Sequence, residues 1–285
     1  MRKTPSIYAR YFGFSEDPFS PTPDPAFLFE SKSYSRAIAW MSYAIEQREM
    51  GLVIGEVGSG KTLLSRNLVD SLDADKHRIA WLINPQLSPG NFLKEIFSLL
   101  FDAKPKFFKR DVLKELGEGL TELYLKDIFP VIIIDEAQSI PSKAVFDEIR
   151  LLNNFQTDKQ NLVSIILLGQ PELEKRLRHP AYRALVQRFR FTTKLEPLNP
   201  DETEVYLQHR LETAGYNGQK LFSQEAARQI YALTNGYPRP INHLATLSLM
   251  AAMEDDQAQI QPAAVEAASK GILYLSDLKA EKKRK

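Results

Sequence analysis

Residues 55 to 62 read Gly-Glu-Val-Gly-Ser-Gly-Lys-Thr and lie between an apolar run and a helical pattern. The spacing fits G-x-x-x-x-G-K-[ST], in which glycines let backbone N–H groups converge on a polyphosphate at a helix N-terminus. Residues 51–54 can form a buried strand, and leucines recur at helical spacing over residues 63–72. A strand, a glycine-rich loop and a helix in this order predict a phosphate-binding P-loop.

Two side chains of this loop have predicted roles in addition to those of the backbone. Lys61 reaches the β and γ phosphates of the ligand, and Thr62 ligates Mg²⁺. The glycines are needed because the loop must turn its N–H groups inward. The predicted binding residues are Gly55, Glu56, Val57, Gly58, Ser59, Gly60, Lys61, Thr62 and Leu63.

A second apolar strand supplies the carboxylates that hydrolysis requires. Residues 131–134 read Val-Ile-Ile-Ile, and Asp135 and Glu136 follow directly. Behind a P-loop, these positions predict Asp135 in the Mg²⁺ shell and Glu136 as the group that orients the attacking water. The two motifs together predict hydrolysis of a bound nucleoside triphosphate.

Composition favours two domains and excludes several classes of site. The chain has 285 residues and 44% hydrophobic composition, enough for one substantial core and a smaller second one. Its 37 basic and 36 acidic residues give no global charge that favours nucleic acid or an anionic membrane. The absence of cysteine excludes disulfides and cysteine-based metal sites. With no signal peptide and no run of about 20 apolar residues, we expect a soluble cytoplasmic protein without a membrane span.

Between residues 31 and 198, short apolar runs alternate with helical patterns. Such alternation is typical of a parallel sheet covered on both faces, so we predict an α/β nucleotide-binding core with a five-stranded parallel sheet. Strands are expected at 51–54, 78–83, 131–134, 163–168 and 189–194. Helices are expected at 32–47, from the P-loop to 72, and at 89–100, 111–125 and 142–154.

Segments of different character flank this core. Residues 1–30 contain five prolines and seven aromatic residues, which predicts an extended strap whose aromatics pack onto the next domain or around adenine. Residues 199–272 are predicted to form a small all-helical lid domain, with Asp201 and Ser223 capping its first two helices. Residues 273–285 form a basic tail, either a solvated terminus or a contact for nucleic acid or lipid.

Two polar residues follow strands of the predicted sheet. In an α/β sheet the ligand lies at the carboxyl ends of the strands, so Gln170 is expected near the γ-phosphate. It is either a polar sensor of that phosphate or a residue that forms the turn. Asn84 closes the strand at 78–83 and can hydrogen-bond Glu136, holding it inactive until a partner binds.

Three arginines are candidates for neutralising charge during phosphoryl transfer. Arg188 and Arg190 precede or begin the last strand, and one of them is predicted to act on the nucleotide of a neighbouring subunit, with Arg188 preferred. Arg239 follows Gly236-Tyr-Pro at a predicted helix start and is expected to couple the γ-phosphate to the lid. Surface arginines without such roles are the alternative for all of them.

Taken together these motifs resemble those of the AAA+ ATPases and, more closely, the ExeA/GspA family of general secretion pathway ATPases. The resemblance covers roughly residues 8–270, and its motifs lie at 11–19, 22–25, 55–62, 135–138, 148–153, 169–173 and 236–239. It implies ATP binding and hydrolysis, subunit assembly into a homo-oligomer, a sheet order of 5-1-4-3-2 and a helical lid. We expect a short, MshM-like form without the transmembrane helix and peptidoglycan-binding domain of long members. The ATPase domain is also similar to transposition regulators of the TnsC and TniB type.

Two functions follow from this resemblance. The first is an oligomeric Mg-ATPase that drives or regulates assembly of a cell-envelope complex, a secretion system or a type IV-like pilus. The second is an ATPase that assembles on duplex DNA and recruits a partner enzyme. Residues 104–110, Lys-Pro-Lys-Phe-Phe-Lys-Arg, bear on the second, because four cations with interleaved aromatics can contact phosphates. A solvated loop is the alternative for this segment.

Overall fold

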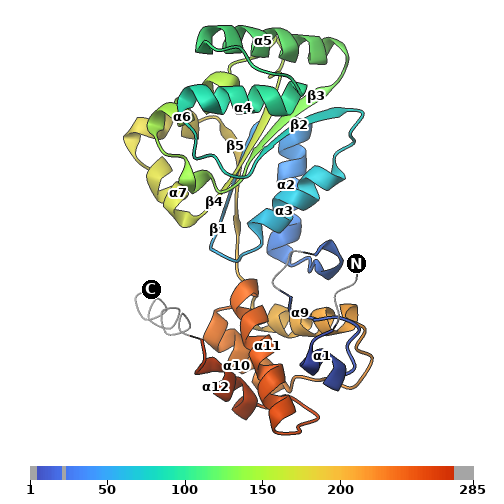
Figure 1. The fold of residues 1–285 in the computed structure, drawn as a ribbon. Helices are drawn as coiled ribbons and strands as arrows, with labels where there is room; N and C mark the ends of the chain where they lie inside the picture. The colour runs from blue at the N-terminus through green and yellow to red at the C-terminus, as the bar shows by residue number, and fades with distance from the viewer. Residues whose placement is uncertain (1–4, 21–23, 273–285) are drawn as a thin grey trace. The chain divides into compact units, whose positions relative to one another are not determined.

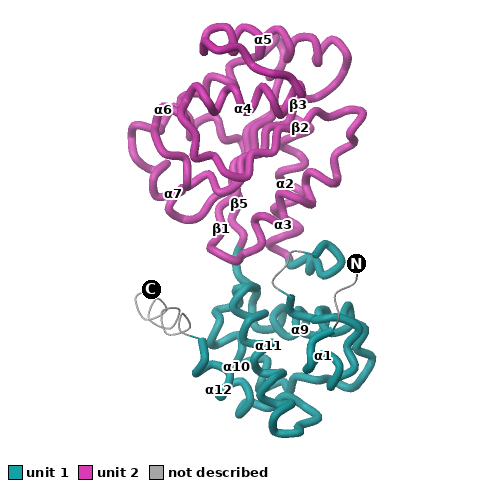
Figure 2. The backbone as a smooth tube through the Cα atoms, in the orientation of Figure 1, with its two compact units in different colours: residues 1–31, 196–285 teal, residues 32–195 magenta. Residues whose placement is uncertain are grey.

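The structure is a computed structural model that describes residues 5–20 and 24–272. The backbone divides into two compact units, coloured separately in Figure 2. The core unit comprises residues 32–195, and the helical unit combines residues 1–31 with residues 196–285. The predicted basic tail, 273–285, lies outside the described residues.

The core unit is built on the predicted five-stranded sheet. Its strands pair in the order β2-β3-β4-β1-β5, and every pair is parallel, which confirms both the fold class and the order implied by the resemblance. The three inner strands are buried at every position, as a sheet covered on both faces requires. The strands are β1 (Met50–Gly55), β2 (His77–Leu82), β3 (Phe129–Ile134), β4 (Ser164–Gly169) and β5 (Phe189–Leu195).

Helices cover both faces of this sheet (Figure 1). One face carries α2 (Lys32–Glu46) and α3 (Lys61–Ser71). The other face carries α4 (Pro89–Phe101), α5 (Lys109–Leu125), α6 (Lys143–Leu152) and α7 (Pro171–Leu177). All five strands and helices α2 to α6 therefore lie where the sequence predicts them, with ends shifted by a few residues.

Alternate residues of each strand serve the two faces of the sheet. Leu52 and Ile165 belong to the hydrophobic cluster that α4 to α7 form with the sheet. Toward the other face, a Cβ at Gly51 would lie 2.7 Å from Met41 Sδ of α2 and 2.9 Å from Ile166 Cδ1. A larger residue at this position would therefore require the Met41 and Ile166 side chains to move.

Two helices between β4 and β5 were not predicted. Helix α7 has 7 residues and α8 (Arg183–Val186) has 4, and the 3₁₀ turn η3 (Pro180–Tyr182) lies between them. Such short helices do not repeat a hydrophobic period, so their sequence resembles that of a loop. This stretch connects Gln170 to Arg188, two of the predicted site residues.

The C-terminal part of the helical unit is helical, as predicted for residues 199–272, and contains α9 (Pro200–Thr213), α10 (Gln224–Thr234), α11 (Pro238–Glu254) and α12 (Pro262–Ser269). Ser223 caps α10 as predicted, but the prediction of Asp201 as the cap of α9 is wrong. Asn199 caps this helix, because its side chain accepts from the Glu202 N–H while the Glu202 carboxylate accepts from the Asn199 N–H. Asp201 lies in the first turn instead.

The N-terminal strap belongs to the helical unit. It contains one short helix, α1 (Ile7–Tyr11), and the 3₁₀ turn η1 (Pro25–Phe27). Its aromatic residues Tyr8, Phe14, Phe19 and Phe27 are buried in the hydrophobic cluster formed by α9 to α12. The prediction that they pack onto the domain next in sequence is therefore wrong for these four residues.

Candidate functional site

The glycine-rich loop connects β1 to α3 and leaves the start of that helix uncapped by a side chain. Gly60 is the N-cap residue with a φ of +98°, and Gly58 has a φ of +78°. Both conformations are left-handed, which glycine adopts without the cost that a Cβ imposes. Because Gly60 provides no side-chain cap, the first N–H groups of α3 are suited to bind an anion, and the helix dipole also favours negative charge there.

Lys61 is buried at the base of the loop. Its Nζ donates to the Gly55 carbonyl at 2.8 Å and to the Glu56 carbonyl at 3.0 Å. A buried ammonium group needs such acceptors, because an unpaired charge in this setting is costly. The contacts keep the lysine cation beside the loop that the phosphates would enter.

Ser59 supplies a test of whether the loop fits a phosphate. Its Oγ is buried and has no hydrogen-bond partner among the described residues. A buried hydroxyl without a partner is unfavourable, and a phosphate oxygen between the loop and α3 is a suitable acceptor for it. The open glycine backbone, the lysine and this hydroxyl therefore fit a polyphosphate group.

Asp135 lies at the end of β3 and is completely buried. Its Oδ2 accepts from the Ser65 hydroxyl at 3.1 Å, and its Oδ1 accepts from the Glu136 N–H at 2.8 Å. Burial raises the pKa of the Asp135 carboxyl above its ordinary value, and hydrogen bonds from the Glu136 N–H and the Ser65 and Thr62 side chains partly offset this effect. The predicted pair of Mg²⁺ ligands, Thr62 and Asp135, is thus brought together.

Ser65 is a site residue that the sequence reasoning missed. It lies in α3, and its hydroxyl links the helix that follows the P-loop to the carboxylate at the end of β3. Its position one helical turn after Lys61 places both residues on the same side of α3. The spacing of one helical turn from Lys61 is therefore the feature of the sequence from which Ser65 could have been predicted.

Glu136 follows Asp135 in a left-handed backbone conformation, with a φ of +50°. Such a conformation is uncommon for a residue with a side chain and is maintained only where neighbouring contacts fix it. The Glu136 carbonyl accepts from the Ser139 N–H at 2.8 Å and from its hydroxyl at 2.7 Å. The turn η2 (Ala137–Ser139) thereby fixes the backbone that carries the predicted water-orienting acid.

Two glutamines hold the carboxylate of Glu136. Gln170 Nε2 donates to Glu136 Oε2 at 3.0 Å, and Gln138 Nε2 donates to the same oxygen. The Gln170 N–H in turn donates to Gln138 Oε1 at 3.0 Å. Gln170 was predicted near this position, whereas Gln138 had no predicted role although it lies two residues after Glu136.

Asn84 is not part of this network. It is exposed, and its Oδ1 accepts from the Gln86 N–H at 3.3 Å, a contact typical of a turn. No hydrogen bond joins Asn84 to Glu136 in the described part of the chain. In this structure, Gln138 and Gln170 therefore make the contact that we expected of Asn84.

Arg188 and Arg190 flank the first residue of β5, and both are exposed. Arg188 Nη2 donates to Asn154 Oδ1 at 3.1 Å, just beyond the end of α6. Their exposed side chains are accessible to a second subunit. Arg239 is also exposed and is the second residue of α11 in the helical unit, directly after Pro238.

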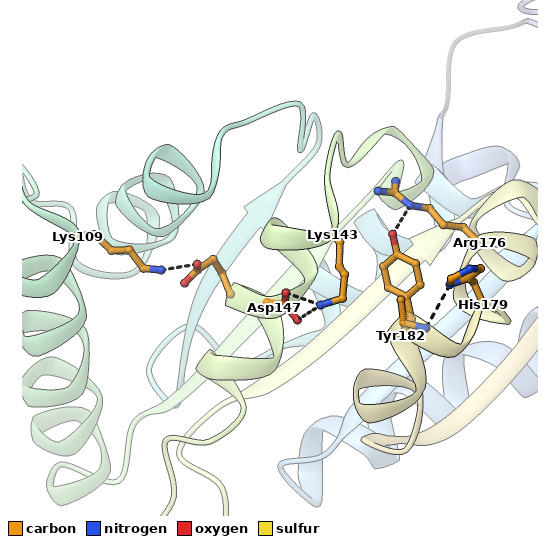
Figure 3. A network of polar contacts seen from close by, with 8 residues as sticks. Lys109, Lys143, Asp147, Arg176, His179 and Tyr182 are labelled. Atoms are coloured by element: carbon orange, nitrogen blue, oxygen red, sulfur yellow. Dashed lines mark hydrogen bonds and ion pairs between the residues drawn. The ribbon is translucent and has the colours of Figure 1, made fainter.

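Three of the four cations in the basic segment 104–110 lie close to acids. Lys109 pairs with Glu148 of α6, and Figure 3 labels Lys109 and marks its contact with a dashed line. Lys106 lies 3.7 Å from Glu115, and Arg110 lies 3.4 Å from Asp111. These pairs reduce the charge available to nucleic-acid phosphates. Phe107 and Phe108, by contrast, are 79% and 67% exposed.

Over residues 5–20 and 24–272, no helix combines the length and the apolar character that crossing a bilayer requires. Within the same ranges, no three acidic or histidine residues cluster as metal ligands. Mg²⁺ at this site would therefore be held by Thr62, Asp135 and the phosphates themselves, which is how this cation is commonly bound beside nucleotides.

Comparisons with known proteins agree with this geometry. A family model described as an AAA domain matches residues 44–177. The chain is 35% identical to general secretion pathway protein A of Aeromonas hydrophila over 254 residues, which cover 86% of this chain and 45% of that protein. The chain is an AAA+ protein.

Two further comparisons extend over most of the chain. A potential ATP-binding protein of Staphylococcus aureus is 24% identical over 240 residues, covering 76% of this chain and 86% of that protein. The crystal structure of Cdc6p from Pyrobaculum aerophilum aligns with a TM-score of 0.65 at 17% identity, over 90% of this chain and 71% of that chain. At that identity the structural match shows the fold alone.

The AAA+ chain spans less than half the length of general secretion pathway protein A, since the match covers 45% of that relative. Membership of the family agrees with the P-loop and with the carboxylates at the end of β3. The chain is thus related to nucleotide-binding ATPases.

Proposed function

We propose that this chain is a Mg-dependent ATPase that oligomerises around ATP and drives or regulates assembly of a secretion or type IV-like pilus complex. The observation that supports hydrolysis most directly is the juxtaposition of Asp135 and Glu136 with the P-loop helix. Ser65 of α3 hydrogen-bonds Asp135, and Glu136 follows with its carboxylate held by two glutamines. A module that only bound nucleotide would not need a water-orienting acid.

In the proposed mechanism, each side chain has a separate task. The N–H groups at the start of α3 and the Lys61 ammonium bind the β and γ phosphates, for which Lys61 leaves its present carbonyl partners. Glu136 orients a water in line with the γ-phosphate and accepts its proton. Mg²⁺, held by Thr62 and Asp135, would neutralise charge on the phosphate oxygens.

Oligomerisation enters the proposal because the charge that develops on the phosphoryl group can be neutralised from a neighbouring subunit. Arg188 and Arg190 are exposed at the edge of the core unit, so either can serve this role. Arg239 of the helical unit is proposed to sense the γ-phosphate. A cytoplasmic location and a protein partner of the cell envelope belong to the same proposal.

The role in envelope assembly is supported by the identity with general secretion pathway protein A, which extends over 86% of this chain. The alternative, an ATPase that assembles on duplex DNA, depends on residues 104–110. Because acids pair with Lys106, Lys109 and Arg110, this segment offers less net charge than its sequence indicates.

Steady-state ATP hydrolysis at low salt, with and without duplex DNA, tests this proposal. We expect turnover by the wild type, loss of nucleotide binding or turnover in Lys61→Ala, and retained ATP binding without turnover in Glu136→Gln. Activity that is indifferent to DNA supports the envelope-assembly function, and stimulation by DNA supports the alternative. Unchanged hydrolysis in both variants would refute the site assignment.

A further inference from the structure

Gln138 connects the two residues predicted to act on the γ-phosphate and its attacking water. Its Nε2 donates to Glu136 Oε2, and its Oε1 accepts the Gln170 N–H at 3.0 Å. Gln170 closes the network, because its own side chain donates to the same Glu136 oxygen at 3.0 Å. The side-chain amide of Gln138 thus contacts the Glu136 carboxylate through its nitrogen and the residue that precedes α7 through its oxygen.

The orientation of the Gln138 amide is fixed by this arrangement. Its oxygen must point to the Gln170 N–H, which is a donor only, and its nitrogen must point to the carboxylate, which is an acceptor when ionised. A flipped amide would place oxygen against oxygen and N–H against N–H. The residue therefore has one favourable orientation, and it holds Glu136 Oε2 in that position.

Both glutamines contact the same oxygen of Glu136. No protein donor bonds to Oε1 in the described residues, so this second oxygen is free to accept a hydrogen bond from water. The left-handed backbone of Glu136, with its φ of +50°, fixes the direction from which the side chain leaves β3. Contacts from Ser139 thus fix the backbone of Glu136, and contacts from the two glutamines fix its carboxylate.

We propose that Gln138 is a positioning residue that holds Glu136 Oε2 and so directs Oε1 toward the attacking water. The inference rests on the proposed ATPase function and adds a residue to that site. Gln138 is half-buried and belongs to the three-residue turn η2, outside the hydrophobic core. A substitution there consequently affects the site more than the fold.

Gln138→Glu is the most informative variant because it preserves shape and retains an acceptor for the Gln170 N–H. It removes the donor to Glu136 and places a second carboxylate beside the first. We expect kcat to fall about ten-fold or more at about pH 8, since a hydrogen bond to a charged group is lost. Affinity for a non-hydrolysable ATP analogue is expected to stay within about two-fold, because the hydrogen bonds of Gln138 within the described residues go to Glu136 and Gln170 and not to the P-loop.

The pH profile separates positioning from a structural effect. Two neighbouring carboxylates favour sharing one proton, and a protonated Glu at position 138 would regain a donor toward Glu136. The rate of Gln138→Glu relative to the wild type is therefore expected to rise as pH falls from about 8 to about 6. Gln47→Glu is the matched control, because it makes the same change at an exposed glutamine just after α2 of the core unit, and its pH profile is expected to follow that of the wild type.

The same variant in a Glu136→Gln background completes the test. Glu136→Gln is expected to retain a small residual single-turnover rate. If Gln138 acts through Glu136, Gln138→Glu lowers this residual rate by a much smaller factor than it lowers the rate of the wild type. An equal loss in both backgrounds, an unchanged kcat or an increased kcat would overturn the proposal. If the wild type hydrolysed no ATP and its rate could not be distinguished from that of Lys61→Ala, the proposed ATPase function itself would be refuted.

Discussion

At the scale of single residues, the site keeps a carboxylate out of water. Asp135 is completely buried and receives hydrogen bonds from one backbone N–H and from Ser65. Burying an ionised carboxylate is costly even when such donors are present. The buried carboxylate is therefore expected to reduce the stability of the protein without nucleotide, a cost that fits its proposed role as a ligand of Mg²⁺.

The raised pKa of Asp135 predicts how stability depends on pH. An acid whose pKa is higher in the folded state binds more protons when folded, so its contribution to stability falls as pH rises through this range. The loss begins near the ordinary value of 3.8 and is complete above the raised pKa. Asp135→Asn lacks this titration, so its stability relative to the wild type is expected to increase with pH across that window.

Urea unfolding of both proteins between about pH 4 and pH 8, without nucleotide or Mg²⁺, measures this difference. Ser65→Ala provides a comparison, because it removes a donor to the ionised form and should destabilise the protein most at high pH. A free-energy difference between Asp135→Asn and wild type that is constant over the whole range would contradict the expected role of burial.

Residues whose chemistry is tied to a fixed spacing could be predicted from the sequence. Lys61, Asp135 and Glu136 belong to such patterns. The structure adds Ser65, whose hydroxyl links the helix that follows the P-loop to Asp135. Gln138 could not be assigned, because its role depends on how a three-residue turn orients its amide toward Gln170. The hydrogen bond expected between Asn84 and Glu136 is not among those of the described residues. The order of the strands alone does not decide which polar side chain reaches Glu136.

At the scale of elements, α7 is attached to the turn η2 at both of its ends. Gln170 precedes the helix and bonds Gln138, while Arg176 near its end donates to the Ile140 carbonyl just after the turn. Arg176 also donates to the Tyr182 hydroxyl at 3.0 Å, as Figure 3 shows. Its guanidinium lies over the Phe146 ring, 4.9 Å from the centroid. One arginine thus connects the turn, α6 and η3.

Arg176→Ala is expected to destabilise the core unit by about 1–3 kcal/mol, because the Ile140 carbonyl loses its charged donor and two rings lose a packing partner. Arg178→Ala is the matched control on the same helix. Arg178 pairs with Glu174 at 2.8 Å and its side chain is 75% exposed, so its loss should cost less than about 1 kcal/mol. Urea unfolding distinguishes the two variants, and equal effects would exclude a special role for Arg176.

Element prediction succeeded where a hydrophobic period repeats and failed where it does not. The strands and long helices of the core unit follow such periods, whereas α7 and α8 are too short to show one. The cap of α9 was misassigned because both Asn199 and Asp201 suit that position. The reciprocal bonds of Asn199 with Glu202 decide between them.

At the scale of the whole molecule, two segments that are far apart in the sequence form one compact unit. Residues 1–31 join residues 196–285, and the core unit lies between them in sequence. Arg210 of α9 stabilises this arrangement, because its guanidinium donates to the Pro18 and Ser20 carbonyls and lies over the Phe27 ring. Burial lowers the pKa of the Arg210 guanidinium from its ordinary value. Sequence alone could not show this association, because it joins segments far apart in the chain.

Phe19→Ala is expected to weaken the helical unit by about 3–5 kcal/mol, since Phe19 is 3% exposed and packs edge-on against Phe222. Ile7→Ala, in the same strap but at a residue that is 69% exposed, should change stability by less than about 0.5 kcal/mol. Hydrogen exchange should accelerate in α9 to α12 of the first variant and stay nearly unchanged in β1 to β5. Faster exchange throughout both units would contradict this assignment of the strap.

The position of the strap also has a consequence for synthesis of the protein. The ribosome makes the strap before the core unit, and the sheet of residues 32–195 can form before α9 to α12 have left the exit tunnel. The aromatic residues of the strap find their partners only once α9 to α12, which end at Ser269, have been translated. The strap is therefore made before the core unit but buried only after it, and the nascent chain exposes its aromatic residues while residues 32–195 are being translated.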